Sequence, residues 1–243
     1  MQKSKTRIFI NEKITKNSII YIKNKQHHFL RNVLRAKIND QVKIFDGISG
    51  EWEAKVSAIN RSNTILSVIT KNHDLNKSSD IWLIFAPIKQ NRMSIAIQKA
   101  TELGVSKIFP CLTEYTNIRK INLKNLKDNA IESAEQCERL DIPHIEKLYN
   151  LEEILSNWPT NRKLIFCDER LEKNELILKT LAPLNDSRYK FAVLIGPEGG
   201  FSESEKKLIK SSRSVVSISL GKRILRADTA ITVALYCLQE LTN

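Results

Sequence analysis

The placement of glycine constrains this chain more than any other feature of its sequence. Of the seven glycines in 243 residues, four fall in two short segments, residues 196–202 and 220–226. Glycine accepts positive φ and lets a backbone approach another molecule closely. Each segment directly follows an apolar run typical of a buried strand, residues 191–195 and 215–220. Because open α/β sheets bind ligands at the carboxyl ends of their strands, we expect the two loops to form one ligand site.

The hydrophobic pattern changes near residue 75. Before that point, five segments alternate at period two and predict strands: residues 6–10, 18–22, 41–45, 52–59 and 64–70. One amphipathic helix is expected at residues 26–36, and Asp46-Gly47-Ile48-Ser49-Gly50 is expected to form a hairpin loop. This pattern predicts a small β-barrel over residues 1–73, and residues 71–79 are polar enough for a linker.

After that point, apolar runs alternate with amphipathic segments. The expected strands are residues 81–88, 105–112, 163–167, 191–195 and 215–220. The expected helices are residues 92–103, 123–139 and 174–181, one that follows Ser202, and residues 229–241. Ser202 and Glu205 have the spacing of a capping box, which begins the fourth of these helices. Alternating strands and helices predict a mostly parallel sheet covered on both faces, so residues 78–243 are expected to form an α/β domain.

The chain is basic, with a formal net charge of +12, and the charge is unevenly distributed. Residues 1–73 hold 14 Lys or Arg against 5 Asp or Glu, a net charge of +9, which leaves +3 for the other 170 residues. A lysine-rich composition or solvated charge runs can explain a high total positive charge. They do not explain why the charge is concentrated in the N-terminal part of the chain. A polyanionic partner, most simply nucleic acid, is therefore expected for the N-terminal part.

The cysteine pattern and the hydropathy of the chain indicate the cellular compartment in which the protein works. The four cysteines (Cys111, Cys137, Cys167 and Cys237) are widely spaced and form no C-x-x-C pair or Cys/His cluster, which argues against a zinc site. No apolar run approaches the roughly 20 residues of a membrane span, and the first residues are too polar for a signal peptide. We therefore expect a cytoplasmic protein without a bound metal.

Several familiar catalytic motifs are absent. The P-loop pattern fails because Arg223 follows Gly221-Lys222, and the dinucleotide-binding pattern fails at Glu198. Neither G-x-S-x-G nor H-E-x-x-H occurs. The four histidines all lie in the first 144 residues, which disfavours a Ser-His-Asp triad at the glycine segments. The chemistry that remains possible is one that needs binding and positioning more than a protein nucleophile. Group transfer from an activated cofactor fits that description.

Two segments carry a family resemblance: Ile195-Gly196-Pro197-Glu198-Gly199-Gly200-Phe201-Ser202 and Leu220-Gly221-x-Arg223-Ile224-Leu225-Arg226. Further matching segments are Arg7-Ile8-Phe9, His28-Phe29-Leu30-Arg31-Asn32-Val33-Leu34-Arg35, Asp46-Gly47, Gln98-Lys99-Ala100-Thr101-Glu102-Leu103-Gly104-Val105 and Ala134-Glu135-Gln136-Cys137-x-Arg139. Together they resemble the RsmE family of 16S rRNA uridine-N3 methyltransferases, over nearly the whole chain. The resemblance implies methyl transfer from S-adenosylmethionine (SAM) to ring N3 of one uridine near the 3′ end of the small-subunit rRNA.

The resemblance also implies an architecture and an oligomeric state. A PUA-like barrel at residues 1–73 is expected to bind RNA, and a SPOUT methyltransferase domain at residues 78–243 is expected to hold SAM and the dimer interface. SPOUT domains are α/β folds with a deep trefoil knot and work as homodimers. A knot is contrary to the rule that chains do not thread loops, and nothing in the periodicity predicts it.

The resemblance places the cofactor pocket in the two glycine segments. The residues expected to bind SAM are Leu194, Ile195, Gly196, Pro197, Glu198, Gly199, Gly200, Leu220, Gly221, Ile224, Leu225, Arg226 and Thr229, with Glu169 from the loop Asp168-Glu169-Arg170 as a third wall. The glycines would let the main chain reach the edge of the adenine, and the aliphatic side chains would contact its faces. Ordinary αβ turns would explain one such loop but not two.

The expected catalytic residues are Arg226, Glu198 and Asp228. Uridine N3 carries a weakly acidic proton that must leave before or during methyl transfer. The Arg226 guanidinium suits the developing charge on the uracil oxygens, and Glu198 or Asp228 would accept the proton. Two structural roles stay open, because Glu198 would also serve as a cap for the following helix and Asp228 as the N-cap of the last one. Many relatives have Glu where this chain has Asp228, which weakens that assignment.

The expected RNA-binding residues are Arg7, Arg31, Arg35, Glu135, Gln136 and Arg139. The three arginines of the N-terminal part are predicted to contact phosphates, although Arg7 would also suit the target base. Glu135, Gln136 and Arg139 share a helix face, which is more often an ion-paired surface than a binding site.

Two other functions remain open. One is another SPOUT RNA methyltransferase, such as a tRNA ribose 2′-O-methyltransferase. The other is a non-catalytic RNA-binding or ribosome-assembly factor that has a vestigial pocket, and specific SAM binding would distinguish it from an enzyme.

Overall fold

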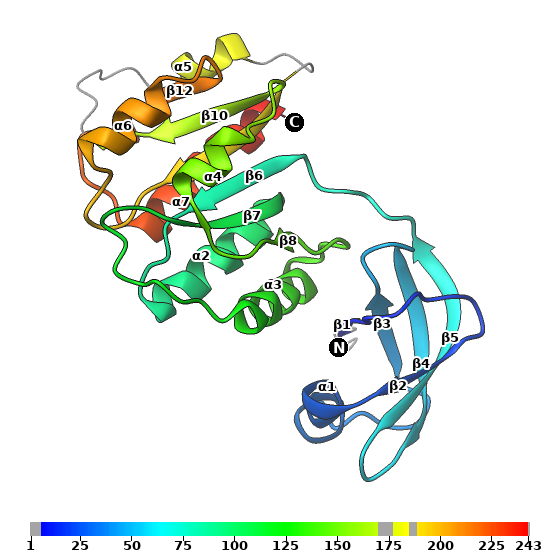
Figure 1. Cartoon of the computed structure of the whole chain (residues 1–243). Helices are drawn as coiled ribbons and strands as arrows, with labels where there is room; N and C mark the ends of the chain where they lie inside the picture. The colour runs from blue at the N-terminus through cyan, green and yellow to red at the C-terminus, as the bar shows by residue number, and fades with distance from the viewer. Residues whose placement is uncertain (1–5, 170–176, 185–188, 243) are drawn as a thin grey trace. The chain divides into compact units, whose positions relative to one another are not determined.

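The computed structural model describes residues 6–169, 177–184 and 189–242, and the chain forms two compact units. The N-terminal unit consists of Met1–Lys77 together with Ala134–Ile142, and the α/β unit consists of Ser78–Ser133 and Pro143–Asn243 (Figure 1). The hydrophobic pattern placed the boundary near residue 75. The structure adds that a second segment, Ala134–Ile142, packs with the N-terminal unit.

The N-terminal unit is built on one mixed sheet of five strands, each at a position that the sequence pattern predicts. The strands are β1 (Arg7–Phe9), β2 (Ile19–Ile22), β3 (Gln41–Phe45), β4 (Glu51–Ile59) and β5 (Thr64–His73). Their order is β1-β3-β4-β5-β2, with β1 parallel to β3 and the other pairs antiparallel. The alternating apolar side chains of these strands face a single core, to which Ile8, Ile20, Val42, Ile44, Ala54, Val56, Leu66 and Val68 belong.

The predicted hairpin loop at residues 46–50 joins β3 to β4. The Asp46 carboxylate accepts hydrogen bonds from the backbone N–H groups of Ile48 at 2.8 Å, Ser49 at 2.6 Å and Ile14 at 2.9 Å. Burial alone would raise the pKa of Asp46, but these hydrogen bonds outweigh it and hold the pKa below its usual 3.8. Gly50 has φ +94°, and a Cβ there would lie 2.1 Å from the His73 carbonyl oxygen, so only glycine fits.

The helix predicted at residues 26–36 is wrong in its bounds and its type. The structure has a short α-helix, α1 (Asn24–His28), which continues as a π-helical turn over Phe29–Val33. The Leu34 N–H bonds the Phe29 carbonyl five residues back at 2.9 Å. The next residue, Arg35, has φ +50° and ends the helix. Apolar spacing does not distinguish a π-turn from an α-turn over so short a segment.

The α/β unit contains a parallel sheet, as the alternating pattern predicts. Its strands are β6 (Ile81–Phe85), β7 (Val105–Leu112), β8 (His144–Ile145), β9 (Tyr149–Asn150), β10 (Arg162–Cys167), β11 (Lys190–Ile195) and β12 (Val215–Ile218). The order is β12-β10-β11-β6-β7-β8, every ladder is parallel, and β9 also pairs with β7. In β11 every residue after the first is buried, which is typical of a central parallel strand.

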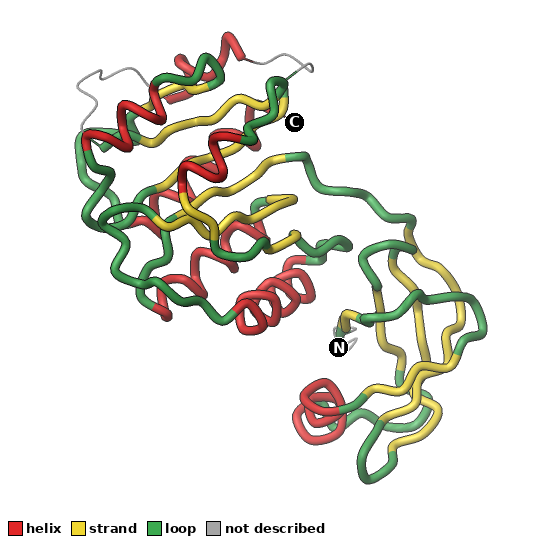
Figure 2. The backbone as a smooth tube through the Cα atoms, viewed as in Figure 1, coloured by secondary structure: helices red, strands yellow, loops and turns green. Residues whose placement is uncertain are grey.

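Helices join these strands and pack in two groups (Figure 2). They are α2 (Gln90–Glu102), α3 (Leu123–Cys137), α4 (Leu151–Ser156), α5 (Ile177–Leu181), α6 (Glu203–Lys210) and α7 (Ala227–Thr242), with a 3₁₀ turn at Ala182–Leu184. Helices α2 and α5 contact α7, whereas α4 contacts α6, as expected when helices cover both faces of a sheet. Within the described ranges, no helix is long and apolar enough to cross a bilayer.

One helix start agrees with expectation, and the start of the last helix differs from it. The capping box predicted at Ser202 is present: the Ser202 Oγ accepts from the Glu205 N–H, and the Glu205 carboxylate accepts from the Ser202 N–H. Helix α7 begins at Ala227, so Asp228 lies in its first turn and is not its N-cap. Of the helix predicted at residues 174–181, the structure describes α5 (Ile177–Leu181), and its expected first three residues lie outside the described ranges.

Candidate functional site

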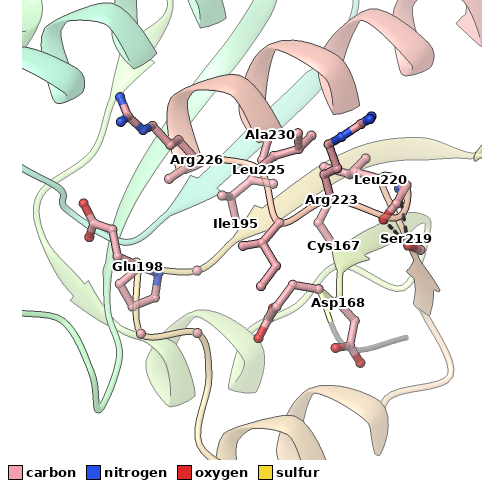
Figure 3. Close-up of a pocket in the computed structure, with 18 residues that line it drawn as sticks. Cys167, Asp168, Ile195, Glu198, Ser219, Leu220, Arg223, Leu225, Arg226 and Ala230 are labelled. Atoms are coloured by element: carbon pink, nitrogen blue, oxygen red, sulfur yellow. Dashed lines mark hydrogen bonds between the residues drawn. The ribbon is translucent and has the colours of Figure 1, made fainter. Parts of the chain in front are cut away.

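Three loops of the α/β unit meet over the carboxyl ends of three neighbouring strands. Because β12, β10 and β11 are adjacent in a parallel sheet, the loops that follow them emerge at the same edge. They enclose a cavity of about 340 Å³, which we call the glycine-loop cavity (Figure 3). Its lining residues are Cys167, Asp168, Glu169, Ile195, Gly196, Pro197, Glu198, Gly199, Gly200, Ser219, Leu220, Gly221, Arg223, Ile224, Leu225, Arg226, Ala227 and Ala230.

The first glycine segment is closely packed against its surroundings. A Cβ at Gly196 would lie 2.6 Å from the ring of Phe201, which is buried and packs edge-on against Phe166. Gly200 has φ +71°, and a Cβ there would lie 2.6 Å from the Glu169 carboxylate. At Gly196 the buried ring of Phe201 leaves no room for a side chain, and at Gly200 the positive φ disfavours one.

The second glycine segment is open. Gly221 has φ +116°, and beyond its two chain neighbours no described residue has an atom within 4 Å of the position that its Cβ would take. Its backbone therefore borders free space in the cavity. Ile195 and Ala230 are buried in the wall, whereas the Ile224 side chain lines the cavity while 84% exposed. An open backbone beside aliphatic side chains suits a planar heterocycle, whose edge needs hydrogen bonds and whose faces need apolar contact.

Two oppositely charged side chains lie on one side of the cavity. Figure 3 shows Arg226 and Glu198 on that side and Arg223 on the opposite side. The Arg226 residue is exposed, and its carbonyl accepts the Ala230 N–H at 2.8 Å in the first turn of α7. The Glu198 carboxylate lies 3.4 Å from Nη1 of Arg92, which belongs to α2. These charges are available to a ligand that enters from solvent.

Not every residue expected at the site lines the cavity. Leu194 is in the sheet core with 1% of its surface exposed, and Thr229 lies on α7 outside the lining. Asp228 does not line the cavity either, and its Oδ1 is buried without a hydrogen-bond partner among the described atoms. Arg170, from the expected third wall, lies outside the described residues.

The structure adds lining residues to the set expected to bind SAM, including Asp168 of the loop that was expected to form the third wall. Asp168 is 3% exposed, and its carboxylate forms an ion pair with Lys210 at 2.8 Å. Burial raises the pKa of the neighbouring Cys167 thiol, which therefore stays protonated near neutral pH. The others are Ser219, Arg223, Ala227 and Ala230. Position at the carboxyl end of a predicted strand was the signal that would have included Cys167 and Asp168.

Arg7, expected at an RNA surface, lies inside the N-terminal unit. It is 9% exposed and forms an ion pair with Glu51, which is fully buried. Lys43 also pairs with Glu51, at 3.2 Å. Arg31 and Arg35 are exposed, and Arg31 donates to the Asn60 and Arg61 carbonyls at 3.3 and 3.1 Å. Of the three arginines, these two are therefore the ones accessible to a phosphate in this unit.

The three residues expected on the face of α3 lie in the part of the chain that packs with the N-terminal unit. The Glu135 carboxylate accepts from the Phe9 N–H at 2.8 Å. Arg139 donates to both carboxylate oxygens of Asp141, at 2.9 and 3.0 Å. Gln136 is exposed. Helix α3 ends at Cys137, so Arg139 does not share its face as expected, and both Glu135 and Arg139 have partners within this unit.

Metal ligation has no support in the described part of the chain. No group of three or more His, Cys, Asp or Glu side chains there is arranged to hold a metal ion.

Comparison with known proteins shows what the chain is similar to. Residues 75–239 match a family model for an RNA methyltransferase domain, and residues 22–69 match a family model for an RNA methyltransferase PUA domain. A "Ribosomal RNA small subunit methyltransferase E" from Rickettsia conorii is 35% identical over 94% of this chain and 93% of that protein. A protein of the same name from Buchnera aphidicola subsp. Schizaphis graminum is 32% identical over 98% of this chain and 97% of that protein.

Two solved structures share the fold over nearly the full length. A putative methyltransferase from Legionella pneumophila in complex with SAM has a TM-score of 0.87 and 26% identity, and 98% of each chain is covered. A ribosomal RNA small subunit methyltransferase E from Neisseria gonorrhoeae bound to SAM has a TM-score of 0.84 and 25% identity, with the same coverage. Matches that run through both units and identities above 30% over nearly its whole length show that this chain belongs to the ribosomal RNA small subunit methyltransferase E family.

Proposed function

We propose that this protein transfers a methyl group from SAM to ring N3 of one uridine near the 3′ end of the small-subunit rRNA. The chain is a SAM-dependent rRNA methyltransferase, as its family membership establishes. The methylated position and the roles of individual residues are the proposal. One observation carries it: both glycine segments line a single cavity, and Arg226 and Glu198 lie together on one side of it.

The residues of the glycine-loop cavity fit SAM. The backbone at Gly221 is accessible and borders open space beside the aliphatic side chains of the cavity wall. A planar adenine can therefore approach the main chain closely. A side chain on residue 221 would occupy that space, and a positive φ disfavours one. When bound, SAM supplies an electrophilic methyl group attached to a sulfonium. We assign the cavity residues of the segments 195–200 and 220–225, with Glu169, to SAM binding, and Arg226 to the substrate.

We assign the charged side chains to removal of the N3 proton and to stabilisation of the negative charge that develops on the uracil ring. Arg226 is placed to hold the uracil oxygens, on which negative charge develops as N3 loses its proton. Three carboxylates line the cavity: Asp168, Glu169 and Glu198. Asp168 is ion-paired with Lys210, whereas Glu198 lies on the same side of the cavity as Arg226, so we assign proton acceptance from N3 to Glu198. Asp228 lies outside the lining, and we assign it to the first turn of α7, where a carboxylate is favourable.

Three further features of the proposal rest on the family resemblance. We propose that the α/β unit is a SPOUT domain with a trefoil knot, that the N-terminal unit closes as a PUA-like barrel, and that the protein works as a homodimer. An rRNA substrate also implies action in the cytoplasm. The exposed Arg31 and Arg35 would contact phosphates, which the excess positive charge of residues 1–73 supports.

The test is methyl transfer from labelled SAM to small ribosomal subunits that lack the modification. Reverse transcription then locates the product, because a methyl group on N3 blocks Watson–Crick pairing and stops the polymerase. We expect incorporation of label and one stop at a uridine near the 3′ end of the rRNA. Incorporation without a stop would indicate a ribose 2′-O product and overturn the N3 assignment. Absence of transfer to subunits that bind the protein would favour the non-catalytic factor.

A further inference from the structure

A second cavity of about 430 Å³ lies in the α/β unit, and the proposed methyl transfer gives it no role. It lies between the start of α2, the irregular segment 113–122 that follows β7, and the start of α3. We call it the amide cavity. Its lining residues are Ile88, Gln90, Met93, Ser94, Ile118, Lys120, Ile121, Asn122, Asn125, Leu126 and Asn129. Because it follows β6 and β7, it lies at the same edge of the parallel sheet as the glycine-loop cavity.

The lining of the amide cavity combines carboxamides with an apolar base. Two of its amides are held in place: Asn129 donates to the Ser94 Oγ at 2.9 Å, and the Asn122 Oδ1 accepts from the Asn125 N–H at 3.2 Å. The side chains of Gln90 and Asn125 are exposed and have no hydrogen-bond partner in the described part of the chain. Below them lie Ile88, Met93 and Leu126, which are at most 6% exposed.

Two contacts join the walls of the two cavities. Arg92, which lies between lining residues of the amide cavity on α2, contacts Glu198 of the glycine-loop cavity at 3.4 Å. Tyr115, in the segment that continues into Ile118, packs so closely on Gly199 that a Cβ there would be 3.0 Å from the Cβ of Tyr115. The amide cavity is therefore a neighbour of the glycine-loop cavity but is separated from it by these contacts.

We propose that the amide cavity binds the base of a nucleotide next to the methylated uridine in the RNA strand. This inference rests on the proposed function. Side-chain amides offer paired donors and acceptors that match the hydrogen-bonding edges of bases, and apolar side chains suit their faces. The lining contains no carboxylate, and exposed cations lie in the same segments, at Lys89, Arg119, Lys120 and Lys124. These cations suit the phosphates on either side of an inserted base.

The experiment compares Gln90→Ala and Asn125→Ala with the matched control Asn91→Ala, an exposed residue of α2 outside both linings. Steady-state methyl transfer to small subunits is measured together with SAM affinity. Each cavity substitution should raise the KM for subunits about fivefold, the cost of one lost hydrogen bond, with kcat and SAM affinity unchanged. The control should match the wild-type protein. A purely structural role would change kcat or SAM affinity as well.

A second arm does not depend on turnover. Subunits that contain 4-thiouridine near the 3′ end of their rRNA are irradiated with the full-length protein, and the crosslinked peptides are identified by mass spectrometry. We expect crosslinks within residues 88–94 or 118–129, and we expect them to weaken in Gln90→Ala and Asn125→Ala.

The outcomes separate the two proposals. If the wild-type protein methylates subunits but crosslinks only elsewhere, and the substitutions leave KM unchanged, the amide cavity is not a base site and the proposed function stands. If the protein neither binds nor methylates subunits, both proposals fail. A third arm uses uridine 5′-monophosphate alone: tight binding that the two substitutions abolish would assign the cavity to a free nucleotide and overturn the assignment to the RNA strand.

Discussion

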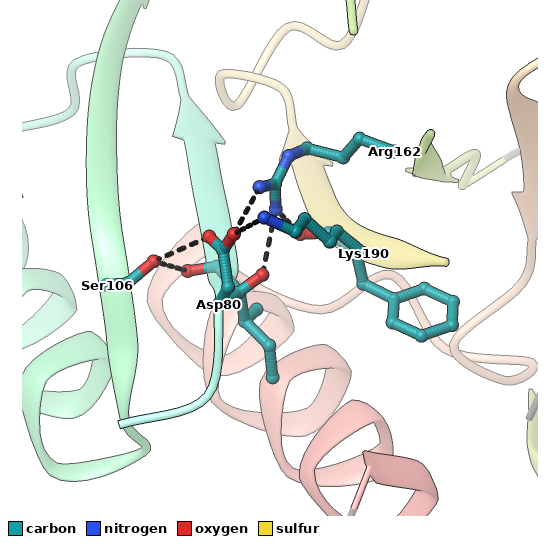
Figure 4. A network of polar contacts seen from close by, with 6 residues as sticks. Asp80, Ser106, Arg162 and Lys190 are labelled. Atoms are coloured by element: carbon teal, nitrogen blue, oxygen red, sulfur yellow. Dashed lines mark hydrogen bonds and ion pairs between the residues drawn. The ribbon is translucent and has the colours of Figure 1, made fainter. Parts of the chain in front are cut away.

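The two ends of the same parallel sheet differ in how their charged residues are paired. At the amino ends of β6, β10 and β11, the Asp80 carboxylate pairs with both Arg162 and Lys190 (Figure 4). One atom of this group, the buried Nε of Arg162, has no hydrogen-bond partner among the described atoms. The Arg162 guanidinium is 2.8 Å from both the carbonyl and the carboxylate of Asp80, and it lies 3.7 Å from the centre of the Trp82 ring. Ser106, at the start of β7, donates to the same carboxylate at 3.2 Å. The charged groups at this end are thus engaged with partners within the protein.

At the carboxyl ends Asp168 pairs with Lys210 at 2.8 Å, but Arg226 and Glu198 are less fully paired. Arg226 is exposed, and Glu198 has one ion-pair partner at 3.4 Å while its side chain is 45% exposed. Gly221 stands open, and the buried Oδ1 of Asp228 has no hydrogen-bond partner among the described atoms. Polar groups that do not satisfy one another lower stability but remain available to a ligand. We therefore infer that the amino end serves stability and the carboxyl end serves function, and four changes test that division.

The largest effect is expected for Arg226→Ala at the carboxyl end. Loss of one preorganised donor to a developing oxyanion should lower the rate of methyl transfer by about 10²–10³-fold. Because Arg226 is exposed, the free energy of unfolding should not change. Single-turnover methyl transfer and SAM titration calorimetry measure the two roles. A parallel loss of SAM affinity would show that Arg226 serves the cofactor or the fold instead.

The converse result is expected for Arg162→Met at the amino end. This substitution leaves the Asp80 carboxylate and two backbone carbonyls without their buried donor, and should lower the free energy of unfolding by about 3 kcal/mol. Lys190→Met is the matched control. Lys190 is 49% exposed, so its loss should cost about 1 kcal/mol or less. Urea unfolding measures both variants. If Arg162→Met lowered SAM affinity under conditions where the variant is folded, the amino end would also serve function, and the inferred division between the two ends would be wrong.

Gly221→Val sharpens the comparison within the carboxyl end. Backbone strain at φ +116° costs about 1–3 kcal/mol, and the side chain would occupy the open space of the cavity, so SAM should bind at least about tenfold more weakly. Gly104→Val is the control, since Gly104 has φ +72° and lies outside the cavity lining. Both variants should lose thermal stability, but only Gly221→Val should lose SAM affinity. Equal SAM affinities in calorimetry would remove residue 221 from the site.

The smallest effect is the pH dependence of the amino end. Burial would raise the pKa of Asp80, but hydrogen bonds and charge from Lys190 and Arg162 outweigh it and hold the pKa below 3.8. A carboxyl with a lowered native pKa contributes stability that is full above its unfolded pKa and is lost as the pH falls through the native value. Asp80→Asn should therefore cost about 1 kcal/mol at neutral pH, and this difference should shrink below about pH 4. Urea unfolding at a series of pH values measures it, and a difference independent of pH would contradict the assignment.

Local sequence patterns predicted much of what positions the site. Alternation at period two located all five strands of the N-terminal unit, and apolar runs located β7, β10 and β11 to within a residue at each end. The capping box at Ser202 located the start of α6. These features depend on neighbours in sequence, so the sequence contains enough information to predict them. Asn150 and Glu153 form a second capping box, which was the overlooked signal for α4.

Other features depend on residues distant in sequence. Arg7 looks like a surface arginine until β4 brings the buried Glu51 beside it. The two-residue strands β8 and β9 have no periodicity of their own and exist because β7 offers them a partner. The amide cavity combines residues of α2, the segment after β7 and α3, and no spacing rule places their amides together.

The division between sequence and structure is clearest at the glycines. The sequence alone determined that two glycine segments follow apolar strands, and therefore that they emerge at the carboxyl edge of a parallel sheet. The first of these strands, β11, is buried as expected, whereas β12 is an edge strand in which Ile218 is buried and the other three residues are half-buried. Only the tertiary structure decided their different tasks: Gly196 makes room for the ring of Phe201, whereas Gly221 borders open space. The physical reason is that backbone freedom belongs to the residue itself, but the atom that would meet its Cβ is supplied by the fold.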